Sequence, residues 1–313
     1  MTMSATWART HAWAAKHPLA LAILAGAVAR LVGATWGLSF HARDDYFHVV
    51  DPAVHWLENP AFDWNASDLA GAGIRSHLVP RVVWLLFLGA RTIGITSPEA
   101  MLRLVYATVG AYSLLVIPAV SLFARRLTRE ETARRATWLA ALYFAMPYLG
   151  TRLLIESLAM PPLVLGLYLA TSQRPSRLLG AGVLVGLACW FRFQVGAAAL
   201  GLAGVIAVRA WKQGGLRAVA RELVPLTVGG AIAIGAQGLF DLWTTGRFLG
   251  PVLANVDINL HPHAELSRST PLAYVGMWLL LTLPPATLVL LAPMVRAGMR
   301  YTIATWPFLI FVL

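Results

Sequence analysis

Apolar residues form long runs along the chain, and short polar segments separate these runs. A helix needs roughly 20 mostly apolar residues to cross a bilayer, and fewer when it is partly buried among other helices. The runs predict membrane helices at residues 18–40, 101–123, 136–151, 153–171, 178–191, 193–210, 223–243, 272–295 and 301–313. Several short runs meet at tight polar points, at Thr151 with Arg152 and at Arg192, which predicts helical hairpins whose tips reach one membrane face.

The composition supports a membrane protein. Of the 313 residues, 58% are hydrophobic and 12% are charged, against about 25% charged residues in soluble domains. One soluble core cannot hide so much apolar surface, whereas lipid can. The single cysteine, Cys189, leaves no internal disulfide framework. We therefore expect an all-α, polytopic membrane protein, with residues 1–313 forming one transmembrane domain. No internal repeat at a fixed period occurs.

The positive charge follows the pattern of a topology signal rather than that of a nucleic-acid-binding surface. The net charge is +11, but the basic residues fall in short clusters between apolar runs, which argues against nucleic acid as a partner. These clusters are Arg9/Lys16, Arg125/Arg126/Arg129/Arg134/Arg135, Arg174/Arg177, Lys212/Arg217/Arg221 and Arg296/Arg300. If all of them are cytoplasmic, the N-terminus is cytoplasmic as well, and the first run, 18–40, is long enough to be a signal anchor that stays in the membrane.

This topology predicts a long first outer loop at 41–100 and a second at 244–271, because the acidic segments 41–68 and 241–265 then lie outside. It requires that segment 77–95 does not cross the bilayer. That segment carries Pro80, Arg81 and Arg91 among its apolar residues, as an amphipathic helix lying at the interface does. The alternative, a full span at 77–95, inverts every later segment.

Two adjacent acids, Asp44 and Asp45, follow the first apolar run. Carboxylates at the end of a membrane helix are costly against lipid, so these are expected to face water or a protein cavity. A carboxylate placed in this way can take a proton from a sugar hydroxyl while that oxygen attacks an anomeric carbon. The alternative is a solvated acidic cap of the outer loop.

Two arginines at helix boundaries are candidate ligands of an anionic group. Arg152 and Glu156 are four residues apart, so on a helix they share a face and can pair. A guanidinium donates two parallel hydrogen bonds to phosphate oxygens, so Arg152 suits phosphate, although a structural ion pair fits equally well. Arg192 is either a snorkelling side chain or a headgroup ligand. Arg30, near the middle of the first run, is expected to face the bundle and to be paired.

Few other chemical motifs occur. The sequence has no Walker loop, GxSxG elbow or HExxH motif. His261, His263 and Glu265 have a spacing that imitates metal ligands, but alternate histidines in a loop are weak evidence, and we expect no metal site. Asp241, at the outer end of run 223–243, is followed by Arg247.

Several motifs together resemble glycosyltransferase family 22, the dolichyl- or polyprenyl-phosphate-mannose-dependent mannosyltransferases of GPI-anchor and N-glycan assembly. Order and approximate spacing agree from residue 30 to about 285. The matching segments are His41-Ala-Arg-Asp44-Asp45-Tyr46-Phe47-His48, Phe62-Asp63-Trp64, Ile74-Arg75-Ser76, Gly150-Thr151-Arg152-Leu-Leu-Ile-Glu156-Ser157-Leu158-Ala159, Arg192-Phe-Gln, and Asp241-Leu-Trp-Thr-Thr-Gly246-Arg247-Phe248 with Asn255. Each match is weak by itself, and their order carries the resemblance.

The resemblance implies a GT-C fold with a catalytic acid in the first outer loop. It also implies transfer of a hexose, expected to be mannose in this family, from a polyprenyl-phosphate carrier to a glycolipid or glycan acceptor. The implied reaction inverts the anomeric centre and needs no cofactor besides the lipid-phosphate sugar. The implied roles are catalytic base for Asp44, with Asp45 as the neighbouring fallback, donor-phosphate binding for Arg152 and Arg192, and positioning of the loop or acceptor for His41, Arg75, Ser76, Asp241 and Arg247. The implied active site faces the lumen or periplasm.

The chain departs from the family pattern at several points. Ala42-Arg43 replaces a proline, Asp45 replaces a glutamate, and Glu156 places a negative charge near the expected phosphate site. Arg300-Tyr301 is the remnant of a basic motif that lies further along in the family, so we expect a shortened C-terminal part. Two other functions remain open: a lipid or solute transporter, which usually shows repeated halves, and an inactive membrane scaffold.

Overall fold

The computed structural model describes residues 16–37, 43–65, 73–143, 145–260 and 300–303, without the side chains of residues 43–45 and 259. All long regular segments in these ranges are helices, which confirms the all-α expectation. They are α2 (Pro18–Trp36), α3 (Arg43–Glu58), α4 (Leu78–Thr92), α5 (Pro98–Ser113), α6 (Val116–Leu127), α7 (Glu130–Leu142), α8 (Ala145–Leu149), α9 (Ile155–Ala170), α10 (Pro175–Phe191), α11 (Val195–Thr245) and α12 (Gly250–Leu260).

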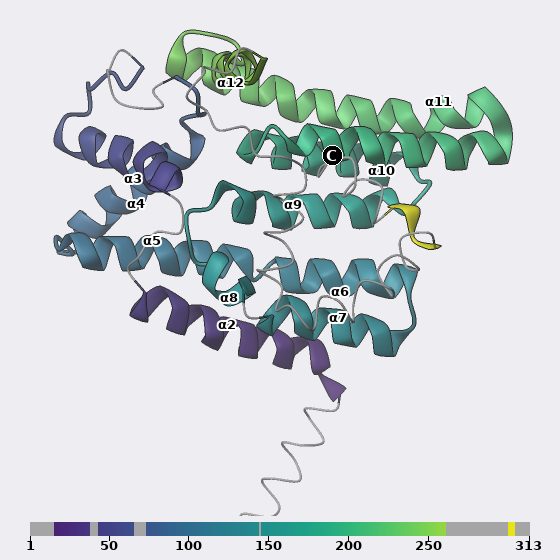
Figure 1. Ribbon diagram of the computed structural model, residues 1–313, viewed down its shortest axis with the longest axis horizontal. Helices are drawn as coiled ribbons and strands as arrows, with labels where there is room; N and C mark the ends of the chain where they lie inside the picture. Colours follow the sequence, from purple (N-terminus) through teal and green to yellow (C-terminus); the bar gives the residue numbers. More distant parts are fainter. Residues whose placement is uncertain (1–15, 38–42, 66–72, 144, 261–299, 304–313) are drawn as a thin grey trace, which may run out of the picture.

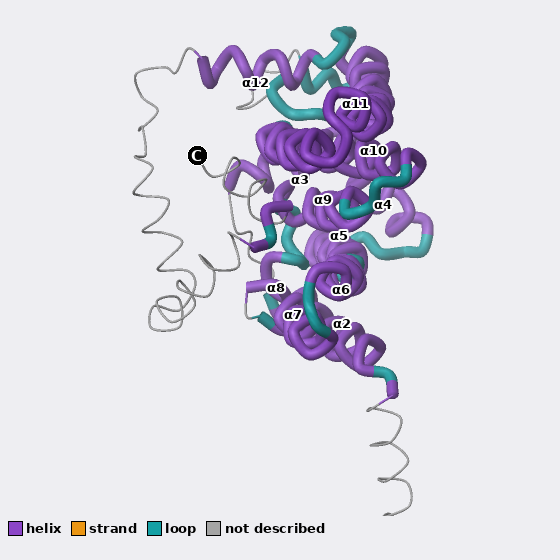
Figure 2. The backbone as a smooth tube through the Cα atoms, turned by 90° about the vertical axis from the view of Figure 1, so that its right-hand side faces the viewer, coloured by secondary structure: helices purple, strands orange, loops and turns teal. Residues whose placement is uncertain are grey.

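The helices form a layered bundle in which α2, α5 with α6, α9, α10 and α11 follow one another side by side (Figure 1). Viewed from the side, the bundle helices are seen nearly end-on, from α2 and α7 at one edge to α11 at the other (Figure 2). In the described part of the chain, α2, the continuous pair α5–α6 and α11 are long and apolar enough to cross a membrane, and α9 and α10 are shorter apolar helices. This arrangement confirms a polytopic membrane protein.

Helix α11 combines the two predicted runs 193–210 and 223–243. Its 51 residues divide into two antiparallel limbs at Gly214 and Gly215, where the backbone leaves helical geometry (Figure 1). Gly215 has φ 61°, a left-handed conformation that glycine adopts without steric cost. The Gly-Gly pair therefore makes the hairpin turn, and the two limbs lie next to α10.

Arg30 faces the bundle interior, as expected. Its side chain is 3% exposed, and its Nε donates to the Ser113 hydroxyl at 2.7 Å. Its Nη1 donates to the carbonyl oxygens of Gly26 and Ala141 at 3.2 and 3.1 Å. Neutral oxygens from three helices thus accept hydrogen bonds from this arginine.

The predicted outer loop at 41–100 contains two helices, α3 and α4, and the second of them lies in the segment for which an amphipathic helix was predicted. Helix α4 covers the predicted segment 77–95 and has only 15 residues, fewer than the roughly 20 that a spanning helix needs. One face, with Val83, Phe87 and Ala90, is buried, and it packs with Val49 and Ala53 of α3 in one apolar cluster. These helices therefore form a cap at one end of the bundle.

The described members of the basic clusters lie at the opposite end of the bundle. The α6–α7 connection, the α9–α10 turn and the hairpin of α11 all lie there, away from α3, α4 and α12 (Figure 1). The N-terminus of α2 is at this end as well, because Pro18 shares a small cavity with Arg125 and Arg134. This separation agrees with the predicted alternation of spans, and the cytoplasmic orientation of the basic end stays a prediction.

The predicted polar turn at Thr151 and Arg152 lies between α8 and α9. Both residues are covered by the surrounding protein, at 0% and 2% exposed, and the membrane face that this turn reaches stays a prediction. The second outer loop contains helix α12, and its residues 261–271 lie outside the described residues, as do run 272–295 and residues 304–313.

Helices α10 and α11 approach each other closely at glycines. A Cβ atom on Gly182 would lie 2.0 Å from the carbonyl oxygen of Leu226, and one on Gly229 would lie 2.1 Å from that of Leu179. Small residues at helix contacts in lipid allow this backbone approach, which strengthens van der Waals packing. The second limb of α11 is thereby held against α10.

Replacing Gly182 with alanine is expected to lower the thermal stability of the purified protein, because overpacking a tight contact costs about 1–3 kcal/mol. The control is Gly235→Ala in α11, where a Cβ atom meets no neighbour within 4 Å. Thermal unfolding in detergent, followed by size-exclusion chromatography, measures both. Equal stability of the two variants would contradict the close packing of α10 on α11.

Candidate active site

A polar network joins three distant segments at the capped end of the bundle. The Ser76 hydroxyl donates to Asp241 Oδ1 at 2.8 Å, and the Trp190 indole donates to Ser76 Oγ at 3.2 Å. Asp241 is fully buried near the end of α11, and its Oδ2 has no hydrogen-bond partner. The network brings together two predicted site residues, Ser76 and Asp241, from positions 165 residues apart.

Two further hydrogen bonds tie the first outer loop to the end of α11 and to α12. Asn255 of α12 donates to the carbonyl oxygen of Ile74 at 2.7 Å. Asn65 donates to the carbonyl oxygen of Thr244 at 3.4 Å. The Ile74-Arg75-Ser76 segment is therefore held on both sides, and its position is set by the C-terminal end of α11.

A small cavity of about 30 Å³ lies beside this network. Its lining residues come from α3, the segment before α4, the start of α4, the start of α9 and the end of α10. They are His48, Val49, Arg75, Ser76, Leu78, Val79, Ile155, Trp190 and Phe191. Asp44 and Asp45 lie in α3 one turn before His48 and Val49, and their side chains lie outside the described part. The α3 backbone thus leads from the two acids to the cavity.

Glu156 pairs with Arg192, and the predicted pairing of Arg152 with Glu156 is wrong. Arg192 Nη1 lies 2.8 Å from Glu156 Oε1, and the side chains are 25% and 47% exposed. Helix α9 begins at Ile155, so Arg152 precedes it and does not share a helical face with Glu156. Arg192 is at the break between α10 and α11, close to Trp190 and Phe191 of the cavity wall.

Arg152 is buried and held by neutral groups. Its Nη1 donates to the carbonyl oxygen of Gly33 at 3.2 Å and to the Thr151 hydroxyl at 3.0 Å. Its guanidinium carbon lies 4.6 Å from the ring centroids of both Tyr106 and Tyr148, within the range of a cation–π interaction. Among the side chains that the structure describes, which exclude those of Asp44 and Asp45, no carboxylate forms an ion pair with Arg152.

A histidine and a stacked arginine stabilise the cap next to the cavity. His77, 3% exposed, contacts the Trp56 ring edge-on at 5.2 Å, and the Arg81 guanidinium lies 4.0 Å from that ring's centroid. Burial, followed by the positive charge of Arg81, lowers the pKa of His77 to about 4, and Asp63 opposes this shift weakly. The ring is therefore neutral at pH 7 and belongs to the apolar support of the Ser76 segment.

The remaining predicted residues do not join this network within the described chain. Arg247 is exposed just after the C-cap Gly246, and its backbone N–H donates to Thr245 Oγ1 at 3.4 Å. His41 lies outside the described residues, as do His261, His263 and Glu265, so the expectation of no metal site stays a prediction.

Sequence reasoning missed the aromatic members of the site. Trp190 supplies an indole donor to Ser76, and Tyr106 and Tyr148 cover the faces of the Arg152 guanidinium. Trp190 lies in the last turn of α10, two residues before the candidate ligand Arg192, and this closeness in sequence was the available signal. Tyr106 gave none, because its contact with Arg152 depends on the packing of α5 against α9.

One comparison with known proteins finds a family. The family model described as the Alg9-like mannosyltransferase family matches residues 21–313. A search of curated proteins finds no match. The matched range includes every residue of the polar network, the cavity and the two arginines described above.

Proposed function

Because the chain belongs to the Alg9-like mannosyltransferase family, we propose that it transfers mannose from a polyprenyl-phosphate carrier to a glycolipid or glycan acceptor, with inversion of the anomeric centre. A membrane glycosyltransferase is what the family and the long apolar helices establish. The observation that carries the finer proposal is the convergence of α3, Arg192 and the Ser76–Asp241 pair at one end of the bundle.

Asp44 is the proposed base. It removes the proton of the acceptor hydroxyl while that oxygen attacks the anomeric carbon of the donor, and the bond to the phosphate oxygen breaks on the opposite face. Its place in the first turn of α3, one turn from the cavity wall, supports this role. Asp45 is the neighbouring alternative.

Arg192 is the proposed ligand of the departing phosphate. It is partly exposed, and Glu156 now occupies one side of its guanidinium. A donor phosphate offers the same acceptor geometry as a carboxylate with more negative charge, so it can replace Glu156. Arg152 lies deeper and adds positive potential that favours charge developing on the leaving oxygen.

The Ser76–Asp241–Trp190 network is proposed to shape the acceptor side of the site. Trp190 and the Asp241 carboxylate fix the orientation of the Ser76 hydroxyl, and the adjacent Arg75 lines the cavity. His41 and the exposed Arg247 are proposed to bind the acceptor from the rim. The whole site is proposed to face the lumen or periplasm, since the basic clusters lie at the other end.

The proposal is tested with purified protein in lipid vesicles, radiolabelled polyprenyl-phosphate mannose and a panel of glycolipid acceptors. Radiolabel is expected in the acceptor, with an anomeric configuration opposite to that of the donor, as determined by NMR of the product. Parallel assays use polyprenyl-phosphate glucose and a soluble nucleotide-mannose. Transfer from the nucleotide sugar alone would refute the lipid-phosphate donor. Movement of labelled lipid between leaflets without any transfer would favour the transporter alternative.

A further inference from the structure

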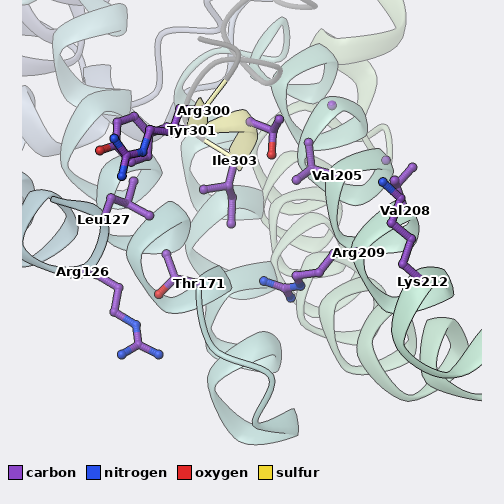
Figure 3. Close-up of a pocket in the computed structure, with 13 residues that line it drawn as sticks. Arg126, Leu127, Thr171, Val205, Val208, Arg209, Lys212, Arg300, Tyr301 and Ile303 are labelled. Carbon is purple, nitrogen blue, oxygen red and sulfur yellow. The ribbon is translucent and has the colours of Figure 1, made fainter. Parts of the chain in front are cut away.

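A second, larger cavity lies at the basic end of the bundle, away from the active site. Its volume is about 810 Å³, within the roughly 300–1,000 Å³ of ligand-binding cavities. It opens between the ends of α6 and α9, the first limb of α11 and residues 300–303 (Figure 3). Helix α10 runs from this end of the bundle to Arg192 at the other end. Its 17 residues correspond to a length of about 25 Å at 1.5 Å per residue.

The described lining of this cavity is strongly cationic. Four lining residues are basic and none is acidic: Arg126, Arg209, Lys212 and Arg300. Arg209 is already engaged, because its Nη2 lies 2.6 Å from the fully buried Glu222. Figure 3 shows Arg209 reaching from α11 towards α9, where it donates to the carbonyl oxygen of Ala170 at 3.4 Å. No carboxylate among the described residues pairs with Arg126, Lys212 or Arg300.

The rest of the lining is mostly apolar. Val205 and Val208 of α11 and Ile303 form walls of the cavity (Figure 3), together with Leu127 and glycines of α11. At Gly204 a Cβ atom would meet no neighbour within 4 Å, so the space beside α11 is open. A ligand that fits this site therefore combines negative charge with an apolar chain.

We propose that this cavity binds an anionic phospholipid of the leaflet at the basic end. Its anionic headgroup lies among the basic side chains of the lining, and one acyl chain lies along the first limb of α11 beside Gly204. Basic pockets between membrane helices bind anionic headgroups in this way. A soluble anion would leave the apolar walls without an apolar contact, and a neutral lipid would leave the three basic side chains without a negative charge. The proposal does not depend on the reaction at the opposite end.

Equilibrium binding of labelled phosphatidylglycerol to the detergent-purified protein tests the site, with labelled phosphatidylcholine and inorganic phosphate as the other probes. The double variant Arg126→Gln/Lys212→Gln is expected to bind phosphatidylglycerol roughly 10- to 30-fold more weakly, since each basic residue near a lipid phosphate contributes about 1 kcal/mol. The control is Arg129→Gln/Arg217→Gln, which removes the same charge from exposed positions at the same end but outside the cavity.

A second variant tests the apolar part. Gly204→Leu places a side chain in the open space and is expected to weaken phosphatidylglycerol binding, while size-exclusion chromatography shows an intact protein. Equal weakening in the control double variant would reduce the effect to general surface charge and overturn the proposal. Equal binding of phosphatidylcholine, or displacement of the lipid by inorganic phosphate alone, would overturn it as well. So would unchanged lipid binding in both cavity variants, the result expected if another part of this chain fills the cavity.

Discussion

Replacing Asp44 with asparagine is expected to lower mannose transfer by roughly 10²- to 10⁴-fold, the usual contribution of a positioned general base. Asparagine keeps the size of the side chain and its place at the start of α3, but it cannot accept a proton. The loss is expected in kcat, with little change in the KM for the donor, because the base acts on the acceptor hydroxyl in the transition state. Initial rates with labelled polyprenyl-phosphate mannose measure both constants.

The position of Asp44 makes this variant a clean test. Helix α3 is anchored further along its length, through Val49, Val50 and Ala53, which are buried against α4 and α5. A change in the first turn should therefore leave folding and membrane insertion intact. Glu58→Gln is the matched control, because Glu58 is an exposed acid at the other end of the same helix.

Asp45→Asn completes the experiment. If Asp44 is the base, this variant loses activity by a smaller factor, through the electrostatic influence of one carboxylate on the other. Near-normal transfer by Asp44→Asn together with a large loss in Asp45→Asn would move the base to Asp45. Normal transfer by both variants would remove the α3 acids from the mechanism.

The sequence predicts the membrane helices well because lipid imposes a simple requirement on each one. A run of apolar residues long enough for the bilayer specifies a span without reference to its neighbours. The basic clusters between runs likewise indicate which ends lie together. Two predictions differ in detail. Runs 193–210 and 223–243 join at Gly214 and Gly215 in one nearly continuous helix. Run 136–151 is divided between α7, which ends at Leu142, and the short helix α8.

The contacts within the site could not be derived in this way. Arg152 and Glu156 are four residues apart, and the pairing rule for helices applies only if both are helical. The helix starts at Ile155, so Arg152 turns into the bundle and Glu156 reaches Arg192 on another helix. Packing between distant segments decides such pairs, and a single sequence does not reveal it.

The hydrogen bond between Ser76 and Asp241 is a second contact that a single sequence does not reveal. Both residues belong to motifs that the sequence singled out, but they are 165 positions apart, and nothing in the sequence indicates that they touch. Their contact depends on the second limb of α11 returning to the capped end, where Asn255 and Asn65 hold the outer loop. The order of the motifs identified candidate site residues, and the topology of the bundle determines which of these residues are in contact.

Replacing Arg192 with glutamine is expected to lower kcat/KM for the donor by roughly 10²- to 10³-fold, the loss typical of removing one preorganised donor to a developing negative charge. Glutamine retains hydrogen-bonding capacity but no charge, so the departing phosphate loses its cation. Arg177→Gln is the control, because Arg177 is an exposed arginine at the basic end of α10. Both variants are compared by initial rates at several donor concentrations.

Glu156→Gln separates a phosphate ligand from a structural arginine. In the free protein Glu156 holds the Arg192 guanidinium at 2.8 Å, and both side chains are partly exposed. Such a pair contributes at most about 1 kcal/mol, so releasing it should lower the donor KM by up to roughly fivefold. Inhibition by free polyprenyl phosphate, the leaving product, should strengthen by a similar factor, because that phosphate contacts the same guanidinium.

The two variants therefore move donor binding in opposite directions if Arg192 binds phosphate. If Arg192 only fastens α10 to α9, both changes break the same ion pair, and both would lower thermal stability without a specific change in donor KM. A higher KM in Glu156→Gln would also contradict the proposal, because it would mean that the carboxylate helps to hold the donor or to orient the guanidinium. The double variant Glu156→Gln/Arg192→Gln should behave like Arg192→Gln alone, since the benefit of removing Glu156 requires the arginine that it releases.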